Sequence, residues 1–276
     1  MGRTPIALTI AGSDSSGGAG IQADLKTFSA FGVYGASVLT ALTAQNTTGV
    51  QGVLAIPPAF VTAQMESVFA DLRLDSIKTG MLANAAIVKA VATALAGLPT
   101  VPVVIDPVMV ATSGDLLLEP DAVAAISGLL LPRGDLVTPN LPEAARLSGE
   151  PEAASVDAMA RQGRIILGNG ARAVLVKGGH GGGDDAIDVL VTHDGVRVFS
   201  GRRVSTPHAH GTGCTLSSAI AALLARGLGL TDAVSRAKTY VRLALEAGRD
   251  LGVGHGHGPV DHLYAVRQLA LPPSDQ

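Results

Sequence analysis

The sequence predicts an α/β protein in which helices cover both faces of a mostly parallel sheet. Short β-rich runs alternate with helical patterns along most of the chain. Hydrophobic residues make up 47% of the 276 residues and charged residues 16%, so the chain can bury one sizeable core. Because no linker, charge block or internal repeat interrupts this pattern, we expect a single domain over residues 1–276.

The expected strands and helices alternate at a spacing that suits parallel strands joined by helical crossovers. The strands, in chain order, are Ile6–Ala11, Val33–Ala41, Val101–Asp106, Leu136–Thr138 and Ala173–Val176. The helices between and after them are Gly20–Phe31, Ala59–Leu72, Asn84–Ala96, Asp121–Leu130 and Val156–Leu167. In the first helix, Ile21, Leu25 and Phe28 fall at positions i, i+4 and i+7 and therefore lie on one face.

The pattern changes near Ala186. Two strands, Ala186–Thr192 and Val196–Ser200, are joined by His193-Asp194-Gly195, and Asp-Gly between two strands predicts a hairpin. We therefore expect an antiparallel edge on the parallel sheet. Two longer helices, Gly213–Arg226 and Thr231–Ala247, follow.

Composition excludes several classes of protein. The net charge is -3, so there is no basic field to attract nucleic acid or a membrane surface. The single cysteine excludes an intramolecular disulfide and a cysteine-based zinc site. The first apolar run, Ile6–Ala11, is too short for a signal peptide, and no stretch is long and unbroken enough to span a bilayer. We expect a cytoplasmic protein.

The first glycine-rich segment, Gly12–Gly20, follows a strand and opens a helix. Gly18–Ala23 fits the dinucleotide pattern GxGxxA, but residues 38–45 lack the acid that would hold a ribose hydroxyl, which disfavours a dehydrogenase. The chain also contains no GxxxxGK[ST] segment, which disfavours a P-loop enzyme. Two interpretations of this segment remain: an ordinary turn, or a loop that lines a substrate pocket. Its free backbone amides and short polar side chains favour the second.

The second glycine-rich segment is a candidate anion site. Gly211, Thr212, Gly213 and Cys214 open an apolar helix, where exposed N–H groups and the helix dipole attract an anion. We expect this position to lower the pKa of the Cys214 thiol. The alternatives are that Cys214 is a small buried hydrophobe in an ordinary turn, or the nucleophile of a cysteine hydrolase with His208 or His210 as its base.

Polar residues at strand ends are further candidates, because open α/β sheets bind ligands at the carboxyl edge. Asp106 follows the strand Val101–Ile105 and is either a ligand-binding carboxylate or a loop cap. Lys177 follows Ala173–Val176 and is either a phosphate-binding group or a solvated lysine. Asn140 and Glu143 lie at a helix start, where they either hold a Mg²⁺-bound water or cap the helix.

Taken together, these segments resemble the hydroxymethylpyrimidine kinase / hydroxymethylpyrimidine phosphate kinase family of the ribokinase-like superfamily. The resemblance covers roughly Ile6 to His262, and its segments occur in the family's order. They are Ala11–Lys26, Thr40–Thr47, Gly80–Leu82, Asp106–Val110, Thr138–Ala144, Val176–His180 and His210–Ser217. Two departures are Thr79, where the family has an apolar residue, and Thr206–His210, where Asn-Thr-His is commoner.

The resemblance implies a three-layer α/β/α sandwich, a homodimer and a kinase of thiamine biosynthesis. The family transfers the γ-phosphoryl of ATP to 4-amino-5-hydroxymethyl-2-methylpyrimidine and then to its monophosphate. By motif, the segment Gly211–Cys214 is the anion hole, and Cys214 stands where most of the superfamily has an aspartate base.

The remaining roles that the resemblance implies concern the substrates and the metal. The pyrimidine is expected near Gly12, Asp24, Gln45 and Met81, and the ATP phosphates near Asp106 and Lys177, with Mg²⁺ near Asn140 and Glu143. Gln45 also follows the strand-like run Val38–Ala44, so we expect it at the ligand crevice. A pyridoxal/pyridoxine kinase of the same fold and a non-catalytic nucleotide sensor are the alternatives to this function.

Overall fold

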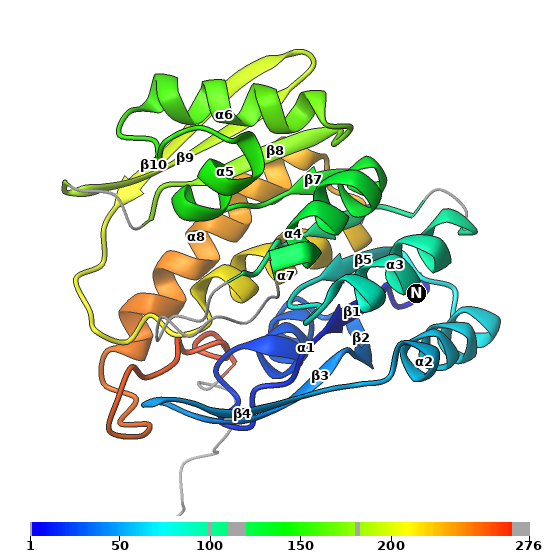
Figure 1. Ribbon diagram of the computed structural model, residues 1–276. Helices are drawn as coiled ribbons and strands as arrows, with labels where there is room; N and C mark the ends of the chain where they lie inside the picture. Colours follow the sequence, from blue (N-terminus) through cyan, green and yellow to red (C-terminus); the bar gives the residue numbers. More distant parts are fainter. Residues whose placement is uncertain (1, 99–100, 110–119, 180–182, 267–276) are drawn as a thin grey trace, which may run out of the picture.

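The computed structural model describes residues 2–98, 101–109, 120–179 and 183–266 (Figure 1). Val110 and His180, which end two of the family-like segments, lie outside these residues.

The central sheet has eight strands in the order β10-β9-β8-β7-β6-β5-β1-β2. All neighbouring pairs from β8 to β2 are parallel, whereas β9 runs antiparallel to both β8 and β10. The predicted mainly parallel sheet with an antiparallel edge is therefore confirmed. Its strands are β1 Ile6–Ala11, β2 Tyr34–Leu39, β5 Ser76–Thr79, β6 Val103–Ile105, β7 Leu136–Val137, β8 Ala173–Lys177, β9 Asp185–Thr192 and β10 Gly195–Arg202.

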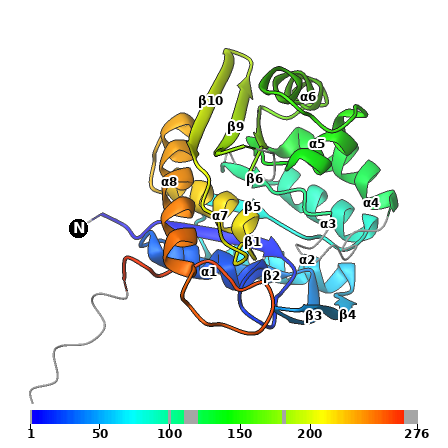
Figure 2. The ribbon, with the colours of Figure 1, turned by 90° about the vertical axis from the view of Figure 1, so that its left-hand side faces the viewer.

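Helices cover both faces of this sheet, which gives three layers (Figure 2). One face carries α1 Gly20–Ala30, α7 Thr212–Ala225 and α8 Leu230–Gly248. The other carries α2 Pro58–Asp71, α3 Ala85–Ala96, α4 Pro120–Ala125, α5 Leu141–Ser148 and α6 Val156–Gly168. A π-helical turn, Ile126–Leu130, and a 3₁₀ turn, Leu131–Arg133, continue α4.

The pleat of the strands divides the apolar side chains between two cores. In β8, Val174 and Val176 pack with the α2–α6 layer, whereas Ala173 and Leu175 pack with α1, α7 and α8. A strand buried on both faces must be apolar almost throughout, as β8 is. No described helix is long and apolar enough to cross a membrane.

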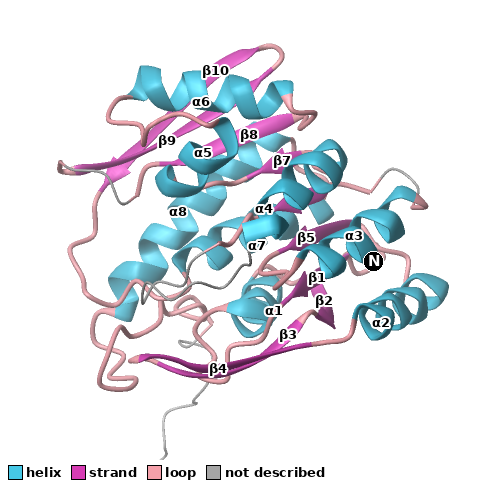
Figure 3. Cartoon of the chain, viewed as in Figure 1, coloured by secondary structure: helices cyan, strands magenta, loops and turns pink. Residues whose placement is uncertain are grey.

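The chain departs from the expected pattern after β2. We expected one strand over Val33–Ala41, but β2 ends at Leu39, and Thr40 turns the chain away by donating its Oγ1 hydrogen to the Met81 carbonyl at 2.6 Å. The chain then forms a separate antiparallel hairpin of β3 Ala41–Asn46 and β4 Gly49–Ala55 (Figure 3). This hairpin brings residues of β3 toward the first glycine-rich loop.

The strand β5 was absent from the expected set. Its four residues, Ser76–Thr79, are all buried and lie between β1 and β6. Three of the four, Ser76, Lys78 and Thr79, are polar, so the sequence has no apolar run here that would identify a buried parallel strand.

Candidate active site

A cleft of about 1320 Å³ lies along the carboxyl ends of the parallel strands. It brings together residues from the ends of β1, β6 and β8 with the glycine-rich loop, the hairpin and the start of α7. Of the twelve residues that the sequence indicated, all but Asp24 line it: Gly12, Gln45, Met81, Asp106, Asn140, Glu143, Lys177, Gly211, Thr212, Gly213 and Cys214.

The start of α7 has the geometry of an anion site. Gly211 is the N-cap with a φ of +80°, a left-handed conformation that favours glycine. A Cβ on Gly211 would overlap the carbonyl oxygen of Gly18, so the two glycine-rich loops are in direct contact. The first N–H groups of a helix have no partner within it. Here the Thr212 N–H donates to the Ala209 carbonyl at 3.3 Å, and Thr212, Gly213 and Cys214 line the cleft.

Lys177 places a positive charge beside this helix start. Its ammonium is 2.9 Å from Asp106 Oδ1, and a Cβ on Gly213 would lie 3.3 Å from it. Burial opposes the charge of Lys177, but Asp106 and Glu143 outweigh that effect and raise the lysine pKa. Lys177 is therefore a cation held against the α7 amides, which is the arrangement a phosphate requires.

Asp106 is held in place by three donors. Besides Lys177, the hydroxyl groups of Thr138 and Ser217 donate to it at 3.2 and 3.1 Å. Burial favours the neutral acid, yet Lys177 and Lys78 hold the pKa of the Asp106 carboxyl below its ordinary value. Asp106 is therefore a buried carboxylate that orients Lys177.

Asn140 and Glu143 form a capping box at the start of α5, as one of the two readings of their spacing predicted. Asn140 Oδ1 accepts from the Glu143 N–H at 2.9 Å, and Glu143 Oε2 accepts from the Asn140 N–H at 2.8 Å. Burial is the main cause that raises the pKa of Glu143 to about 7, and the charge of Asp106 adds to it.

The donor set also fits a magnesium ion carried mainly by a nucleotide. Mg²⁺ takes one or two carboxylates together with phosphate oxygens and keeps several waters. Glu143 lines the cleft, and the negative charge of Asp106 destabilises its anionic form. A nearby cation would reduce the repulsion between these two carboxylates. Within the described residues there is no cluster of three His, Cys, Asp or Glu that could hold a metal alone.

The expected low pKa of Cys214 is wrong for this structure. Burial raises the pKa of the thiol to about 11, and the carboxylates of Asp24 and Asp106 add to the shift. Lys78 acts in the opposite direction. The helix dipole does favour a thiolate at this position, but desolvation of the charged form is the larger effect.

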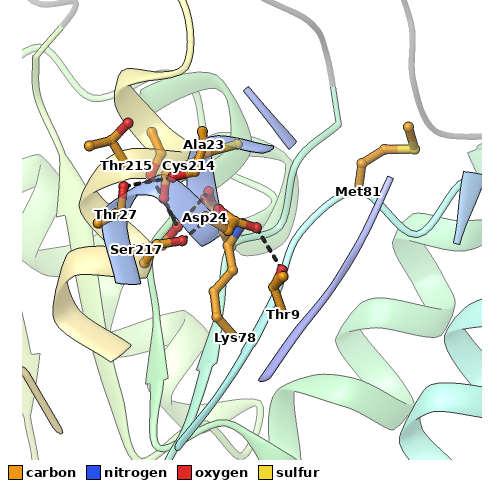
Figure 4. Close-up of polar contacts among 12 residues, drawn as sticks. Thr9, Ala23, Asp24, Thr27, Lys78, Met81, Cys214, Thr215 and Ser217 are labelled. Atoms are coloured by element: carbon orange, nitrogen blue, oxygen red, sulfur yellow. Dashed lines mark hydrogen bonds and ion pairs between the residues drawn. The ribbon is translucent and has the colours of Figure 1, made fainter. Parts of the chain in front are cut away.

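Asp24 is the one of the twelve residues indicated by the sequence that does not line the cleft. Its side chain is fully buried and is not part of the cleft wall. Figure 4 shows it between Thr9 and Lys78 on one side and the first turns of α7 on the other. Both carboxylate oxygens are 2.9 Å from Lys78 Nζ, and the Thr9 hydroxyl donates at 2.6 Å. Its expected role in binding the pyrimidine stays a prediction, and in this structure its oxygens bond to groups of the protein.

Gly12, Met81 and Gln45 lie together at the hairpin end of the cleft. The Gly12 N–H donates to the Met81 carbonyl at 3.1 Å, and a Cβ on Gly12 would lie 2.5 Å from Met81 Cε. Gln45 is in β3, not at the end of a strand of the main sheet as expected. It reaches the cleft because Ser15 bonds to its backbone, accepting from its N–H and donating to its carbonyl at 2.8 and 2.7 Å.

Asp14 and His210 form a buried pair that sequence reasoning missed. His210 Nε2 is 2.7 Å from Asp14 Oδ2, and the same carboxylate accepts the N–H groups of Gly18 and Ala19. Burial would raise the pKa of Asp14, but hydrogen bonds from His210 and Ser16 hold it well below its ordinary value. The pair fastens the first glycine-rich loop to the residue that precedes the α7 turn.

These contacts give no support to a cysteine hydrolase. The hydrogen bond of the His210 ring goes to Asp14, and His208 Nδ1 accepts from the Gly258 N–H at 3.0 Å. A hydrolase of this kind needs one of these rings beside the Cys214 thiol.

Comparisons with known proteins agree with this site. The family model described as phosphomethylpyrimidine kinase matches residues 14–261. The hydroxymethylpyrimidine/phosphomethylpyrimidine kinase of Escherichia coli is 54% identical over 259 residues, which are 94% of this chain and 97% of the relative. The enzyme of the same name from Rhizobium meliloti is 53% identical and covers 95% of this chain and 98% of its own.

Solved structures show the same fold. A Bacillus subtilis pyridoxal kinase in an ADP complex matches with a TM-score of 0.88 at 38% identity, covering 96% of this chain and 99% of its own. A phosphomethylpyrimidine kinase from Clostridium difficile matches with a TM-score of 0.78 at 43% identity, covering 88% of this chain and 100% of its own. The α/β/α sandwich is thus of the ribokinase-like type, and the chain belongs to the phosphomethylpyrimidine kinase family.

Proposed function

We propose that the protein transfers the γ-phosphoryl of ATP to 4-amino-5-hydroxymethyl-2-methylpyrimidine and then to its monophosphate, as a step of thiamine biosynthesis. The observation that carries this proposal is the 54% identity with the Escherichia coli enzyme along nearly the whole of both chains. The cleft supports it, because one cavity holds both the anion site of α7 and the Gly12–Gln45–Met81 end where a small ring would fit.

The residues of the cleft suggest how the transfer proceeds. The α7 amides from Gly211 to Cys214, with Lys177, bind and stabilise the phosphoryl group as its charge develops. Cys214, at the junction of the two ends of the cleft, accepts the proton of the hydroxymethyl group. Asp106 acts indirectly by orienting Lys177. Mg²⁺ would neutralise the nucleotide phosphates, held there by Glu143 and, through water, by Asn140.

A product analysis tests the proposal. Purified protein is incubated with Mg-ATP and either the pyrimidine or pyridoxal, and the products are followed by mass spectrometry. We expect the pyrimidine monophosphate first and the pyrophosphate second, because one anion site can serve both acceptors. A trace that stops at the monophosphate with ATP in excess contradicts the second activity. A higher kcat/KM for pyridoxal would favour the alternative that the pyridoxal kinase structures raise.

Replacing Glu143 by glutamine is expected to raise the Mg²⁺ concentration needed for half-maximal rate. The substitution keeps the size of the side chain but removes the charge that attracts a cation. A Mg²⁺ titration of the initial rate at saturating ATP measures the effect. Unchanged titration curves would leave Glu143 with the capping role alone.

Replacing Gln45 by leucine is expected to weaken use of the pyrimidine more than use of pyridoxal. An amide can accept from the exocyclic amine and donate to a ring nitrogen, and pyridoxal has an oxygen in place of that amine. Leaving the partner groups of these hydrogen bonds unsatisfied costs about 1–3 kcal/mol of binding free energy. The measurement is kcat/KM for both substrates in both proteins, and an equal loss for both would make Gln45 a structural residue.

We also propose a homodimer formed through the β3–β4 hairpin. Leu42 and Leu54 are directly opposite each other on this hairpin and are 40% and 64% exposed, so they form an apolar pair on one face of it. Sedimentation analysis of the native protein and of a Leu54→Asp variant checks the proposal. We expect a dimer that the variant weakens, and a native monomer would contradict it.

A further inference from the structure

A fully buried ion pair lies beside the proposed base and has no part in the mechanism above. Lys78 and Asp24 are both 0% exposed, and the ammonium is 2.9 Å from each carboxylate oxygen. Such pairs are weak evidence for stability, because apolar residues of similar volume often replace them at no cost. Stability alone therefore does not account for this pair.

Asp24 connects the pair to the helix that carries Cys214. The Ser218 hydroxyl donates to Asp24 Oδ1 at 2.5 Å, and Ser218 lies four residues after Cys214, one turn along the same face of α7. The Thr9 hydroxyl donates to the other oxygen from β1. The carboxylate thus fixes the first turns of α7 relative to the sheet, and it fixes the Lys78 ammonium in the same place (Figure 4).

Lys78 also belongs to the wall of the cleft, as does Cys214. A Cβ on Gly80 would lie 2.9 Å from Lys78 Nζ and 3.0 Å from Ala11 Cβ, so the packing beside the ammonium has no room for a side chain. The glycine therefore lets the lysine take up this position at the end of β5.

The charged groups around the Cys214 thiol come from several elements. Asp24 on α1 and Asp106 after β6 disfavour a thiolate, whereas Lys78 on β5 favours it. Lys177, the last residue of β8, also interacts with the charge of Cys214, but it is paired with Asp106. Despite burial, the neighbouring negative charges raise the pKa of Lys78, so it stays an ammonium at any pH at which the enzyme works.

We infer that Lys78 is a positioning residue for proton transfer, and that its ammonium, fixed by Asp24, is the counter-charge of the Cys214 thiolate. In the step that it supports, the thiolate takes the hydroxymethyl proton while the hydroxyl oxygen bonds to the γ-phosphorus and the bond from that phosphorus to ADP breaks. The thiol then returns its proton to solvent, and Lys78 keeps its own throughout. The role of Cys214 in this step rests on the proposed function, whereas the electrostatic link between the two side chains does not.

The single cysteine of the chain makes a direct test possible. The rate of alkylation by iodoacetamide, measured from pH 7 to 10 without substrates, follows the thiolate of Cys214 alone. Lys78→Met removes the counter-charge and should slow alkylation at a given pH by about tenfold, one unit of thiol pKa. Asp24→Asn removes the opposing charge and should accelerate it by a similar factor. Lys89→Met, an exposed lysine on α3, is the matched control and should leave the rate unchanged.

Stability and activity are separated by a second set of measurements. The double variant Lys78→Met/Asp24→Asn carries no unpaired buried charge, so it should fold even where a single variant does not. Because the two single effects are opposite and of similar size, they should largely cancel in the alkylation rate of the double variant. Loss of the fixed ammonium should still lower kcat more than it raises KM for the pyrimidine. Equal alkylation by Asp24→Asn and the double variant, which differ only at Lys78, or shifts of the same sign in both single variants, would overturn the inference. Because alkylation uses no substrate, these outcomes stand whether or not the product analysis supports the proposed function.

Discussion

Replacing Cys214 by alanine is expected to lower kcat by about 10²–10⁴-fold, the usual contribution of a positioned general base. The side chain lines the cleft at the start of α7, where the acceptor hydroxyl and the transferring phosphoryl would meet. Cys214→Ser should lose activity within the same range, because an alcohol is a much poorer base. Cys214→Asp should recover part of the rate. Steady-state kinetics of the three variants measure the effect.

The raised thiol pKa gives this prediction a pH dependence. A base that titrates near 11 is mostly protonated at neutral pH, and its active form increases as pH rises toward that value. We therefore expect kcat/KM of the native protein to climb between pH 6 and 9, and the Asp variant to lack this rise. Full activity of Cys214→Ala would remove the base role, and a trapped phospho-cysteine would replace it with covalent catalysis.

Most of the cleft could be predicted because its residues follow local signals. Asp106 comes directly after the apolar strand β6 and Lys177 is the last residue of the apolar strand β8, and parallel strands place their carboxyl ends at one edge. Gly211 and Gly213, at the start of α7, indicate a helix N-terminus with accessible backbone amides. Each of these residues is identified from the residues next to it in the sequence. The predicted parallel sheet is then enough to place them at the same edge.

The features of the site that could not be predicted depend on contacts between segments that are distant in sequence. Lys78 pairs with Asp24 on another element, and its four-residue strand has only one apolar residue and therefore no pattern that would identify it. The pKa of Cys214 follows the local rule for helix N-termini until burial by other segments reverses it. Gln45 reaches the cleft through a hairpin that begins next to Thr40, whose hydroxyl bonds to the distant Met81 carbonyl. The periodicity of the sequence does not indicate which distant residues will be in contact.

The contact between the two glycine-rich loops predicts a large effect of a side chain added at Gly211. Gly211 has a left-handed backbone, which costs a residue with a Cβ about 1–2 kcal/mol. Its neighbour in space is the carbonyl of Gly18, which a new Cβ would overlap. The peptide groups of Gly18 and Ala19 are held by Asp14, so that loop cannot retreat easily. An added methyl group must therefore displace the α7 turn and the amides that it presents.

Gly211→Ala is accordingly expected to lower kcat by at least about 10²-fold, comparable to the loss of one oxyanion donor. Steady-state kinetics measure the loss, and circular dichroism and the Tm show whether the variant is folded. Gly229→Ala is the matched control, because its φ of -67° suits any residue and no atom lies within 4 Å of the new Cβ. If Gly211→Ala does not fold, Gly213→Ala places a methyl group 3.3 Å from Lys177 Nζ and disturbs the same site without a left-handed residue. Native kcat in a folded Gly211→Ala protein would mean that the amides of this turn do not hold the phosphoryl group.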